Sequence, residues 1–390
     1  SEYALHYAFD AGAQDPFVIL EYATPAEKGW MMLYSEDGHF EGDVSLAYSG
    51  AGGKTSVALT SARTTGSIGK ASTTLPKAAD YQKPTGKSNA KVTDFVLTET
   101  PEGFHYAFNA IGTDYMLLYW RSKEQTVTQP VYPDENGHYE GDVVSELTFA
   151  RTQFTVQVKS GSGSMKKEAT VRKGYQAPEA PQRQEGRLSG VTVCIDAGHQ
   201  ENGRFVNEPI GPGLTGSTSG KGGMAQGTKT NRRESIVCLE IGMLLRDELL
   251  RQGANVVMTR EDQTTFHTNI ERCEIAEAGG AQIMLRLHCN NSSNHSKRGI
   301  QVYGPLNSDY AKAIADADTY REMGQKLLDA MKTRVGMTLA NSTGMVRLND
   351  NYVGNNWAKM MCFLVEMGYL SNPTEEYLLV TPVYQQWLAE

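Results

Sequence analysis

The chain has few cysteines, no long apolar run and no dense basic stretch. All five cysteines lie in the second half, and none shows the paired spacing of a zinc finger. Small disulfide-stapled domains need many cysteines in few residues, so we expect reduced core cysteines here. No apolar run is long enough to cross a bilayer, which predicts no membrane span. A formal net charge of −8 argues against nucleic acid as the main partner.

The first half of the sequence contains one module twice. The segment HYAFD at residues 6–10 recurs as HYAFN at 105–109, and DGHFEGDV at 37–44 recurs as NGHYEGDV at 136–143. The Asp-Gly and Asn-Gly steps between alternating apolar residues predict a tight hairpin in each copy. Short apolar runs without a convincing helical pattern favour a small antiparallel β-sandwich of immunoglobulin-like type. The four histidines of this half recur with the repeat, so we interpret them as framework residues.

The length of 390 residues predicts two or three domains. Two stretches rich in Ser, Thr, Gly, Lys and Pro suggest exposed linkers. We expect a multidomain chain in which tandem all-β sandwich repeats precede an α/β catalytic domain with a mixed sheet flanked by helices. The expected limits are residues 1–63 for the first repeat, 64–90 for a linker, 91–160 for the second repeat, 161–189 for a second linker and 190–390 for the catalytic domain.

The second half alternates strand and helix patterns. Strands are expected at 191–196, 254–260, 281–288, 299–303, 344–348 and 360–366. Helices are expected at 231–252, 269–278 and 374–388, and the pattern at 309–335 fits one long helix or two. Such alternation is typical of a sheet covered by helices on both faces.

Three of these strand patterns end in a histidine or a glutamate. His199, His288 and Glu366 each follow an apolar run directly. In an open α/β sheet, ligands and catalytic groups gather at the carboxyl ends of the strands, so these side chains can meet at one point. A lone histidine at a strand end is more often a hydrogen-bonded core residue than a ligand. The recurrence of the pattern is what favours a shared site.

Glu234 opens the long helical pattern of the second half. It shares an apolar stripe with four residues at helical spacing, which are Cys238, Ile241, Leu245 and Leu249. A carboxylate that faces inward must be paired or must bind a metal ion. Glu234 is therefore a candidate ligand.

Two imidazoles and a carboxylate suit a catalytic zinc ion that keeps one coordination position open for water. The candidate ligands are His199, Glu234 and His288. Glu366 is the candidate proton-transfer group, because burial raises the pKa of a carboxyl group toward the range useful for that role. The alternative for Glu366 is a salt bridge or a partner for a helix N-terminus. The pattern predicts a zinc hydrolase.

The second half resembles the zinc-dependent N-acetylmuramoyl-L-alanine amidases of the amidase_3 family, and the resemblance covers essentially Gly190 to Glu390. The segments that carry it are DAGH at 196–199, the helix-opening Glu234, VMTR at 257–260, Arg272, LHCN at 287–290 and VEMGYLSN at 365–372. The resemblance implies that His199, Glu234 and His288 bind Zn²⁺ and that Glu366 is the catalytic glutamate. It also implies a peptidoglycan hydrolase that cleaves the amide bond between N-acetylmuramic acid and the L-alanine of the stem peptide.

Further expectations follow from this resemblance. Family members carry a small polar residue where this chain has Arg286, which either adds positive charge near the site or faces outward. We expect Asn290 and Arg347 to contact the substrate. With peptidoglycan as substrate, we expect an extracellular, wall-associated protein whose signal peptide has been removed.

The repeated modules are expected to hold the enzyme on its polymeric substrate, because two weak sites joined in one chain raise retention. Four aromatic residues could stack on wall carbohydrate, namely Trp30, Tyr34, Tyr119 and Trp120. The alternative is that they are core residues and that the modules are spacers, because aromatic side chains on strands usually pack inward.

Two other functions remain open at this point. A zinc peptidase could use the same residues to cut within the stem peptide, and a wall-binding protein could carry an amidase-like half with weak activity. The presence of all four matched residues, His199, Glu234, His288 and Glu366, argues against the second alternative.

Overall fold

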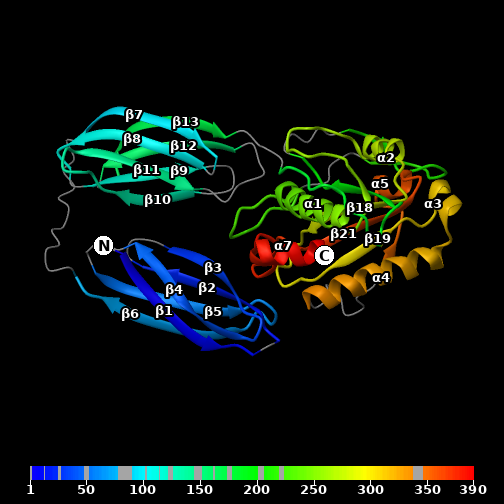
Figure 1. Ribbon diagram of the computed structural model, residues 1–390, viewed down its shortest axis with the longest axis horizontal. Coiled ribbons are helices and arrows are strands. Elements are labelled where there is room, and N and C mark those ends of the chain that lie inside the picture. The colour runs from blue at the N-terminus through cyan, green and yellow to red at the C-terminus, as the bar shows by residue number, and fades with distance from the viewer. Residues whose placement is uncertain are drawn as a thin grey trace. The chain divides into compact units, whose positions relative to one another are not determined.

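The computed structural model divides the chain into two compact units, Ser1–Tyr175 and Gln176–Glu390. The residues that it describes are 2–12, 14–24, 28–47, 52–77, 90–101, 103–113, 115–121, 126–144, 152–160, 163–173, 178–200, 206–218, 224–336 and 346–390. Figure 1 shows strands throughout the first unit and a sheet with helices in the second. This confirms the expected order of a β-rich part followed by an α/β part.

Within the described residues, the first copy of the module has six strands in two sheets. The strands are β1 (Glu2–Asp10), β2 (Phe17–Ala23), β3 (Lys28–Tyr34), β4 (His39–Ala47), β5 (Gly53–Ser61) and β6 (Ser67–Leu75). Strand β1 pairs with β4, while the other sheet has the order β3-β2-β5-β6. Alternate residues of β2 and β4, including Val18, Leu20, Phe40 and Val44, are buried in one core. On β4 the buried residues alternate with exposed or half-buried ones, whereas β2 is buried at four successive positions, so both of its faces are covered there.

The second copy repeats these pairings and adds a strand. Its strands are β7 (Lys91–Thr100), β8 (Gly103–Ile111), β9 (Met116–Arg121), β10 (Thr126–Val131), β11 (His138–Val144), β12 (Thr152–Ser160) and β13 (Met165–Lys173). The sheet orders are β11-β8-β7 and β10-β9-β12-β13. Trp120 is 3% exposed and packs edge-on against Phe104 and Phe154. Of the two alternatives for Trp120, the structure supports a core residue, because its ring is buried and does not face carbohydrate. The immunoglobulin-like identity of the modules stays a prediction.

The Asp-Gly and Asn-Gly steps form turns, but these turns do not close hairpins. Gly38 and Gly137 have φ values of 84° and 79°, which glycine adopts without strain. Strand β3 pairs with β2, however, and β4 pairs with β1. The second copy behaves in the same way, with β10 on β9 and β11 on β8. The hairpin prediction is wrong because the Asp-Gly or Asn-Gly step predicts only the backbone conformation of the turn. It does not determine with which strand each flanking strand pairs.

Two strands lie within stretches that the composition suggested as linkers. Strand β6 pairs with β5, and β13 pairs with β12, each at the edge of its sheet. Most side chains of β6 are exposed or half-buried. An edge strand with this exposure tolerates polar residues, so its composition resembles that of a loop. Residues 78–89 of the first expected linker lie outside the described residues, and the repeat limits stay predictions.

The second unit is built on a six-stranded mixed sheet. Its strands are β14 (Thr192–Ala197), β17 (Asn255–Met258), β18 (Ile283–Asn290), β19 (Gln301–Gly304), β20 (Arg347–Leu348) and β21 (Met361–Tyr369), in the order β17-β14-β18-β21-β19-β20. Four neighbouring strands run parallel to one another, namely β17, β14, β18 and β21. Strand β19 runs antiparallel to β21. The short strands β15 (Glu208–Pro209) and β16 (Ser217–Thr218) form a separate ribbon.

Seven helices accompany this sheet in the described part of the unit. They are α1 (Glu234–Arg251), α2 (Asn269–Ala278), α3 (Asp309–Ile314), α4 (Ala317–Val335), α5 (Val353–Trp357), α6 (Glu375–Leu379) and α7 (Pro382–Ala389). Helices α1, α7 and α4 contact one another in turn, while α2, α5 and α3 form a second contacting group (Figure 1). The pattern at 309–335 forms two helices, because Asp316 caps the second by accepting from the backbone N–H of Thr319.

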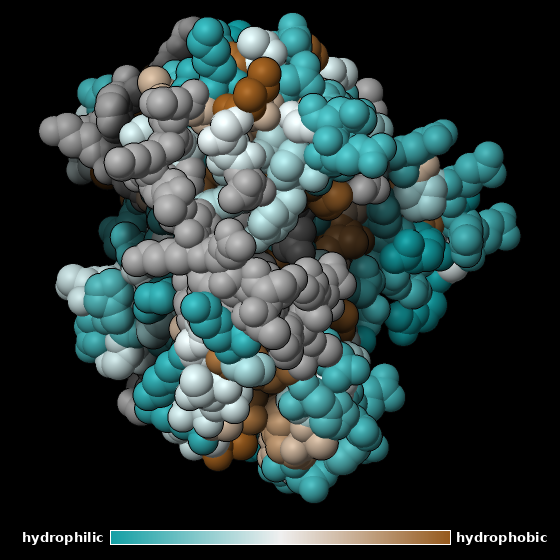
Figure 2. Space-filling view, turned by 90° about the vertical axis from the view of Figure 1, so that its left-hand side faces the viewer, coloured by the Kyte–Doolittle hydropathy of each residue, from teal (hydrophilic) through white to brown (hydrophobic). Residues whose placement is uncertain are grey.

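All five cysteines are free and buried, as expected from their apolar surroundings. The face of the molecule in Figure 2 is mostly hydrophilic, with apolar side chains in small separate groups. Within the described residues, no helix combines the length and the apolar composition needed to cross a bilayer.

Candidate metal centre and active site

The carboxyl ends of neighbouring parallel strands converge on one cavity. Strand β14 leads to His199, β18 carries His288, and β21 carries Glu366. His288 and Glu366 are register partners on β18 and β21. These residues line a cavity of about 470 Å³ together with Glu234, the first residue of α1. The structure thus brings together the four residues that the sequence singled out.

His199, Glu234 and His288 surround a common point. The Nε2 atom of His199 lies 3.1 Å from Oε2 of Glu234, and Nδ1 of His288 lies 3.0 Å from Oε1. The two imidazole rings are 4.9 Å apart and nearly perpendicular. One candidate ligand atom from each residue lies within 4.8 Å of the other two.

Glu234 is held as a buried carboxylate. Its oxygens accept hydrogen bonds from the backbone N–H groups of Ala225 at 2.7 Å and Cys289 at 3.0 Å. Burial alone would raise the pKa of Glu234, but the charges and hydrogen bonds of His199 and His288 lower it below its usual range. Glu234 is therefore ionised at neutral pH, as a metal ligand must be.

The donor set fits a zinc ion. Two imidazole nitrogens and one carboxylate are the ligands of catalytic zinc sites that keep a fourth position open. The Nε2 atom of His288 is buried and has no hydrogen-bond partner among the described residues. A buried polar atom of this kind needs a partner, and a metal ion or a water molecule can provide one.

The turn that carries His199 has an unusual backbone. His199 has a φ of 58°, a left-handed conformation that is uncommon for residues other than glycine. A Cβ atom on the preceding Gly198 would lie 2.7 Å from Cε1 of His288, so only glycine permits this approach. Arg260 donates to the carbonyl groups of Ala197 and Gly198 and holds the turn in place.

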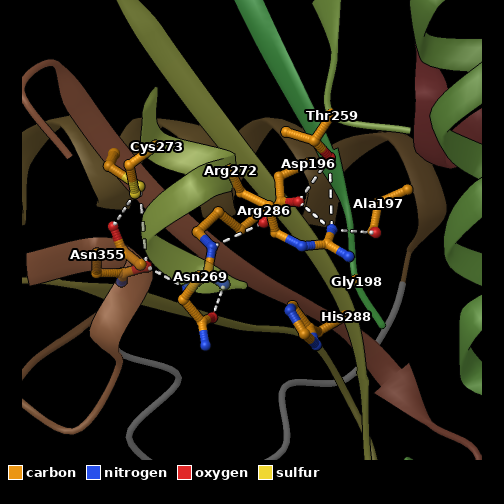
Figure 3. Close-up of polar contacts among 12 residues, drawn as sticks. Asp196, Ala197, Gly198, Thr259, Asn269, Arg272, Cys273, Arg286, His288 and Asn355 are labelled. Atoms are coloured by element: carbon orange, nitrogen blue, oxygen red, sulfur yellow. Dashed lines mark hydrogen bonds and ion pairs between the residues drawn. The ribbon is translucent and has the colours of Figure 1, made fainter. Parts of the chain in front are cut away.

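A buried charge network lies beside this turn (Figure 3). Asp196 is fully buried and accepts hydrogen bonds from Arg272, from Thr259 at 2.7 Å and from Arg286 at 2.9 Å. Burial opposes ionisation of Asp196, but the two arginines hold its pKa well below the usual range. Arg272 also donates to the carbonyl groups of Ala197 and His199. The network thus fixes the backbone from which His199 projects.

Glu366 differs from Glu234 in its environment. Its Oε2 atom is buried and has no hydrogen-bond partner among the described residues. Burial, together with the negative charge of Glu234, raises the pKa of Glu366 well above its ordinary value. A carboxyl group of raised pKa beside two imidazoles can hold a proton and exchange it with a bound molecule. The two glutamates therefore suit different tasks.

Comparisons with known proteins identify the family of the second unit. A model of the Amidase_3 family, described as N-acetylmuramoyl-L-alanine amidase, matches residues 193–390. The chain belongs to this family. The match covers the sheet, the helices and all four residues of the candidate site.

Two curated relatives are each 27% identical to this amidase-family chain over the aligned residues. The germination-specific N-acetylmuramoyl-L-alanine amidase of Bacillus subtilis matches over 216 residues, which is 52% of this chain and 76% of the relative. The probable cell wall amidase LytH of Staphylococcus aureus matches over 212 residues, which is 53% of this chain and 58% of the relative. The chain thus spans about three fifths of the length of the second relative.

Solved structures of amidases align with about half of the chain. An N-acetylmuramoyl-L-alanine amidase from Clostridium difficile has a TM-score of 0.40 at 22% identity, covering 51% of this chain and 90% of that one. The apo form of Ami1 from Mycobacterium abscessus has a TM-score of 0.46 at 20% identity, covering 52% and 94%.

The two expected substrate contacts of this amidase-family chain lie in different places. Asn290 lines the cavity, donates to Gln301 and accepts from the backbone N–H of Asn291. Arg347 begins β20, is exposed, and is not among the described residues that line the cavity. The role of each in substrate binding stays a prediction.

Arg286, which differs from the small polar residue of the family pattern, points into the protein. Its side chain is 3% exposed, lines the cavity and bonds to Asp196 and Asn269, so it does not face outward. A Cβ atom on Gly354 would lie 2.3 Å from the guanidinium carbon of Arg286, so α5 packs directly on this arginine. One signal for the network was visible in the sequence, because two charged residues, Asp196 and Arg286, lie inside apolar strands.

Glu208 and Glu376 belong to the site's surroundings and were missed by sequence reasoning. Glu208 lines the cavity and accepts from the first backbone N–H groups of α2, at Asn269 and Ile270. Glu376 accepts from the backbone N–H groups of Lys229 and Thr230, in the loop that leads to Glu234. Both glutamates are distant in sequence from the groups they bind, so spacing could not reveal them.

Proposed function

We propose that this chain is a zinc-dependent N-acetylmuramoyl-L-alanine amidase, which cleaves the amide bond between N-acetylmuramic acid and the L-alanine of the stem peptide in peptidoglycan. Membership of the Amidase_3 family supports peptidoglycan amide hydrolysis. The single observation that carries the zinc mechanism is the convergence of His199, Glu234 and His288 beside Glu366 in one cavity.

His199, Glu234 and His288 would hold the zinc ion. When bound, zinc supplies Lewis-acid activation of water and stabilises negative charge on the amide oxygen. Glu234 contributes the anionic ligand, which its two backbone N–H bonds and its two histidine neighbours keep ionised. Arg260, through the carbonyl groups that it binds, keeps the turn of His199 aligned with the other two ligands.

Glu366 would transfer the proton. Its carboxylate accepts a proton as water attacks the amide carbonyl, and its carboxyl group then returns that proton to the leaving nitrogen of L-alanine. The raised pKa favours the protonated form needed for the second step. The position of Glu366 beside His288 in the register of two strands supports this role.

Digestion of purified peptidoglycan tests the proposal. The chain should release stem peptides with a new L-alanine amino terminus, and a chelator should abolish release until Zn²⁺ is restored. New termini within the stem peptide would instead identify a zinc peptidase. Full activity after exhaustive chelation would contradict the role of the metal.

The site of action is proposed to be the cell wall, outside the membrane. This follows from the nature of the substrate and from the relatives, of which one is named as a cell wall amidase. The β-rich modules would retain the enzyme on the wall. Tyr34, whose side chain is 38% exposed, is the most accessible of the four aromatic residues considered for carbohydrate contact.

A further inference from the structure

The repeated modules carry the same row of histidines and carboxylates on one sheet face. In the first copy, register pairs on β1 and β4 place His6 opposite Asp43 and Asp10 opposite His39, with Glu41 between them. In the second copy, the equivalent row contains Asp142, His105, Glu140, His138 and Asn109. We name these two rows the histidine ladders. All four histidines of the first half of the sequence lie in them.

One nitrogen of each ladder histidine is already engaged. In the first ladder, Nδ1 of His6 lies 3.1 Å from Asp43, and Nδ1 of His39 lies 2.8 Å from Asp10. In the second ladder the equivalent distances, from His105 to Asp142 and from His138 to Asn109, are 2.9 and 2.8 Å. Because these oxygen atoms only accept, Nδ1 carries the hydrogen in every ring.

The orientation of Asn109 is fixed independently. Its Nδ2 group donates to Asp94 at 2.9 Å, which leaves its Oδ1 atom facing His138. His138 therefore also has an acceptor at Nδ1, although its partner, Asn109, is an amide and not a carboxylate. In the neutral form, the lone pair of each imidazole is consequently on Nε2.

The lone pairs of Nε2 face the central glutamates. In the first ladder, the Nε2 atoms of His6 and His39 lie 3.8 and 3.7 Å from the two oxygens of Glu41. In the second ladder, those of His105 and His138 lie 3.2 and 3.7 Å from the oxygens of Glu140. Neutral Nε2 and a carboxylate oxygen are both acceptors, so a proton, a water molecule or a metal ion between them can satisfy both. Three of the four distances are too long for a direct hydrogen bond.

We propose that each ladder binds divalent transition-metal ions such as Zn²⁺ between Nε2 of a histidine and the central glutamate. An ion about 2.0–2.1 Å from an imidazole nitrogen and about 2.0–2.2 Å from a carboxylate oxygen spans the observed separations. A histidine that binds a metal usually donates its other ring N–H to a carboxylate or a carbonyl oxygen, and Nδ1 does so in both ladders. These sites are separate from the candidate centre at His199, Glu234 and His288.

The ladders are accessible and differ in charge. The side chains of Glu41 and Glu140 are 61% and 59% exposed, so solvent or an anionic ligand can complete the coordination of an ion. The first ladder has three carboxylates, whereas the second has two, because Asn109 stands where the first copy has Asp10. The first ladder therefore binds a divalent cation more tightly.

A proton competes with the metal ion for the same nitrogen. Metal binding to the ladders must therefore weaken as the pH falls, since an imidazole has to be neutral to bind.

Calorimetric titration of the full chain with ZnCl₂ at pH 7.5 tests the proposal. The chain is first loaded at its catalytic centre, so that only additional ions are counted. The parent should bind further zinc ions, and the double variant E41Q/E140Q should bind them about tenfold more weakly or not at all. The variant N109D should strengthen binding by the second ladder.

The controls are E21Q and E99Q, which change exposed carboxylates on β2 and β7 outside the ladders. These variants should bind the additional zinc like the parent. NMR signals of the ladder histidines provide a second readout, since zinc should shift them in the parent and not in E41Q/E140Q. Equal additional binding by the parent and the double variant, or none at about 1 mM zinc, would overturn the proposal.

Discussion

His288 and Glu366 are register partners on adjacent parallel strands, so a candidate metal ligand and the candidate proton carrier are held by one stretch of sheet. The strand backbone, and not a mobile loop, sets the distance between them. Rigid placement of this kind favours catalysis, because misplacing a reacting group by about 1 Å can cost about 10²-fold in rate.

Glu366→Gln should abolish hydrolysis while leaving zinc bound. The change keeps the shape of the side chain but removes the carboxylate that accepts the proton, and loss of a well-placed general base costs about 10²–10⁴ in rate. Peptidoglycan digestion and metal analysis of the same sample check both parts. Near-parent activity would show that another group moves the proton.

His288→Ala should lose stoichiometric zinc, because it removes one of three ligands. His267 lines the same cavity but is outside the ligand group, so His267→Ala is the matched control and should keep its metal. Elemental analysis after dialysis distinguishes the two variants. Retention of one zinc ion per chain by His288→Ala would contradict the ligand assignment.

Asp196→Asn should strongly destabilise the catalytic unit. The substitution leaves the buried guanidinium groups of Arg272 and Arg286 without their carboxylate partner, and breaking a buried ion pair costs about 3–5 kcal/mol. Thr259→Val removes no charge, but it removes the hydroxyl that donates to the same carboxylate and accepts from Arg272, and it should cost about 1.5–3 kcal/mol. Urea denaturation measures both, and equal losses would show that charge pairing is unimportant here.

Stability should depend on pH through Glu375. Burial raises the pKa of this glutamate from an ordinary 4.5 to about 7, although its hydrogen bonds from Tyr369 and Gly299 act in the opposite direction. The folded state thus binds the proton of Glu375 more tightly than the unfolded state does. The resulting contribution of Glu375 to the free energy of unfolding is complete below about pH 4.5 and is lost as the pH rises to about 7.

The free energy of unfolding should therefore fall over this interval, by at most about 3 kcal/mol from Glu375. Glu375→Gln should remove that slope. Glu277→Gln changes an exposed glutamate paired with Lys359 and should leave the slope unchanged. Urea denaturation at a series of pH values provides the comparison. An unaltered slope in Glu375→Gln would show that another group causes the pH dependence of stability.

Tyr34→Ala should reduce co-sedimentation of the full chain with purified cell wall if the modules contact carbohydrate through exposed rings. Loss of one stacking residue is expected to weaken each contact without affecting the catalytic unit. Hydrolysis of a soluble muropeptide by the same variant is the control and should be unchanged. Sedimentation equal to that of the parent would leave this ring without a role in retention.

The sequence was sufficient to find the candidate site but not the network that supports it. Apolar runs that end in His199, His288 and Glu366 predict strand ends, and parallel strands place their ends together. The pairing of Asp196 with Arg286 depends on β14 and β18 being neighbours in the sheet. Strand order results from tertiary packing, so no local pattern contained that information.

The errors in the β-rich half have a related cause. The Asp-Gly step at Gly38 defines a turn correctly, yet the strands on either side join different sheets. The polar strand β6 looked like a linker, because an edge strand needs few apolar residues. In both cases the local signal was present, and the long-range partner determined the structure.

The charge network around Asp196 also bears on how the catalytic unit assembles. Asp196, Arg272 and Arg286 come from β14, α2 and β18, which are far apart along the chain. Docking any two of these elements without the third would bury a charge that lacks its full complement of partners. Partly docked forms are therefore high in free energy, and the three elements should fold and unfold as one cooperative group. A partly assembled catalytic centre is therefore rare at equilibrium.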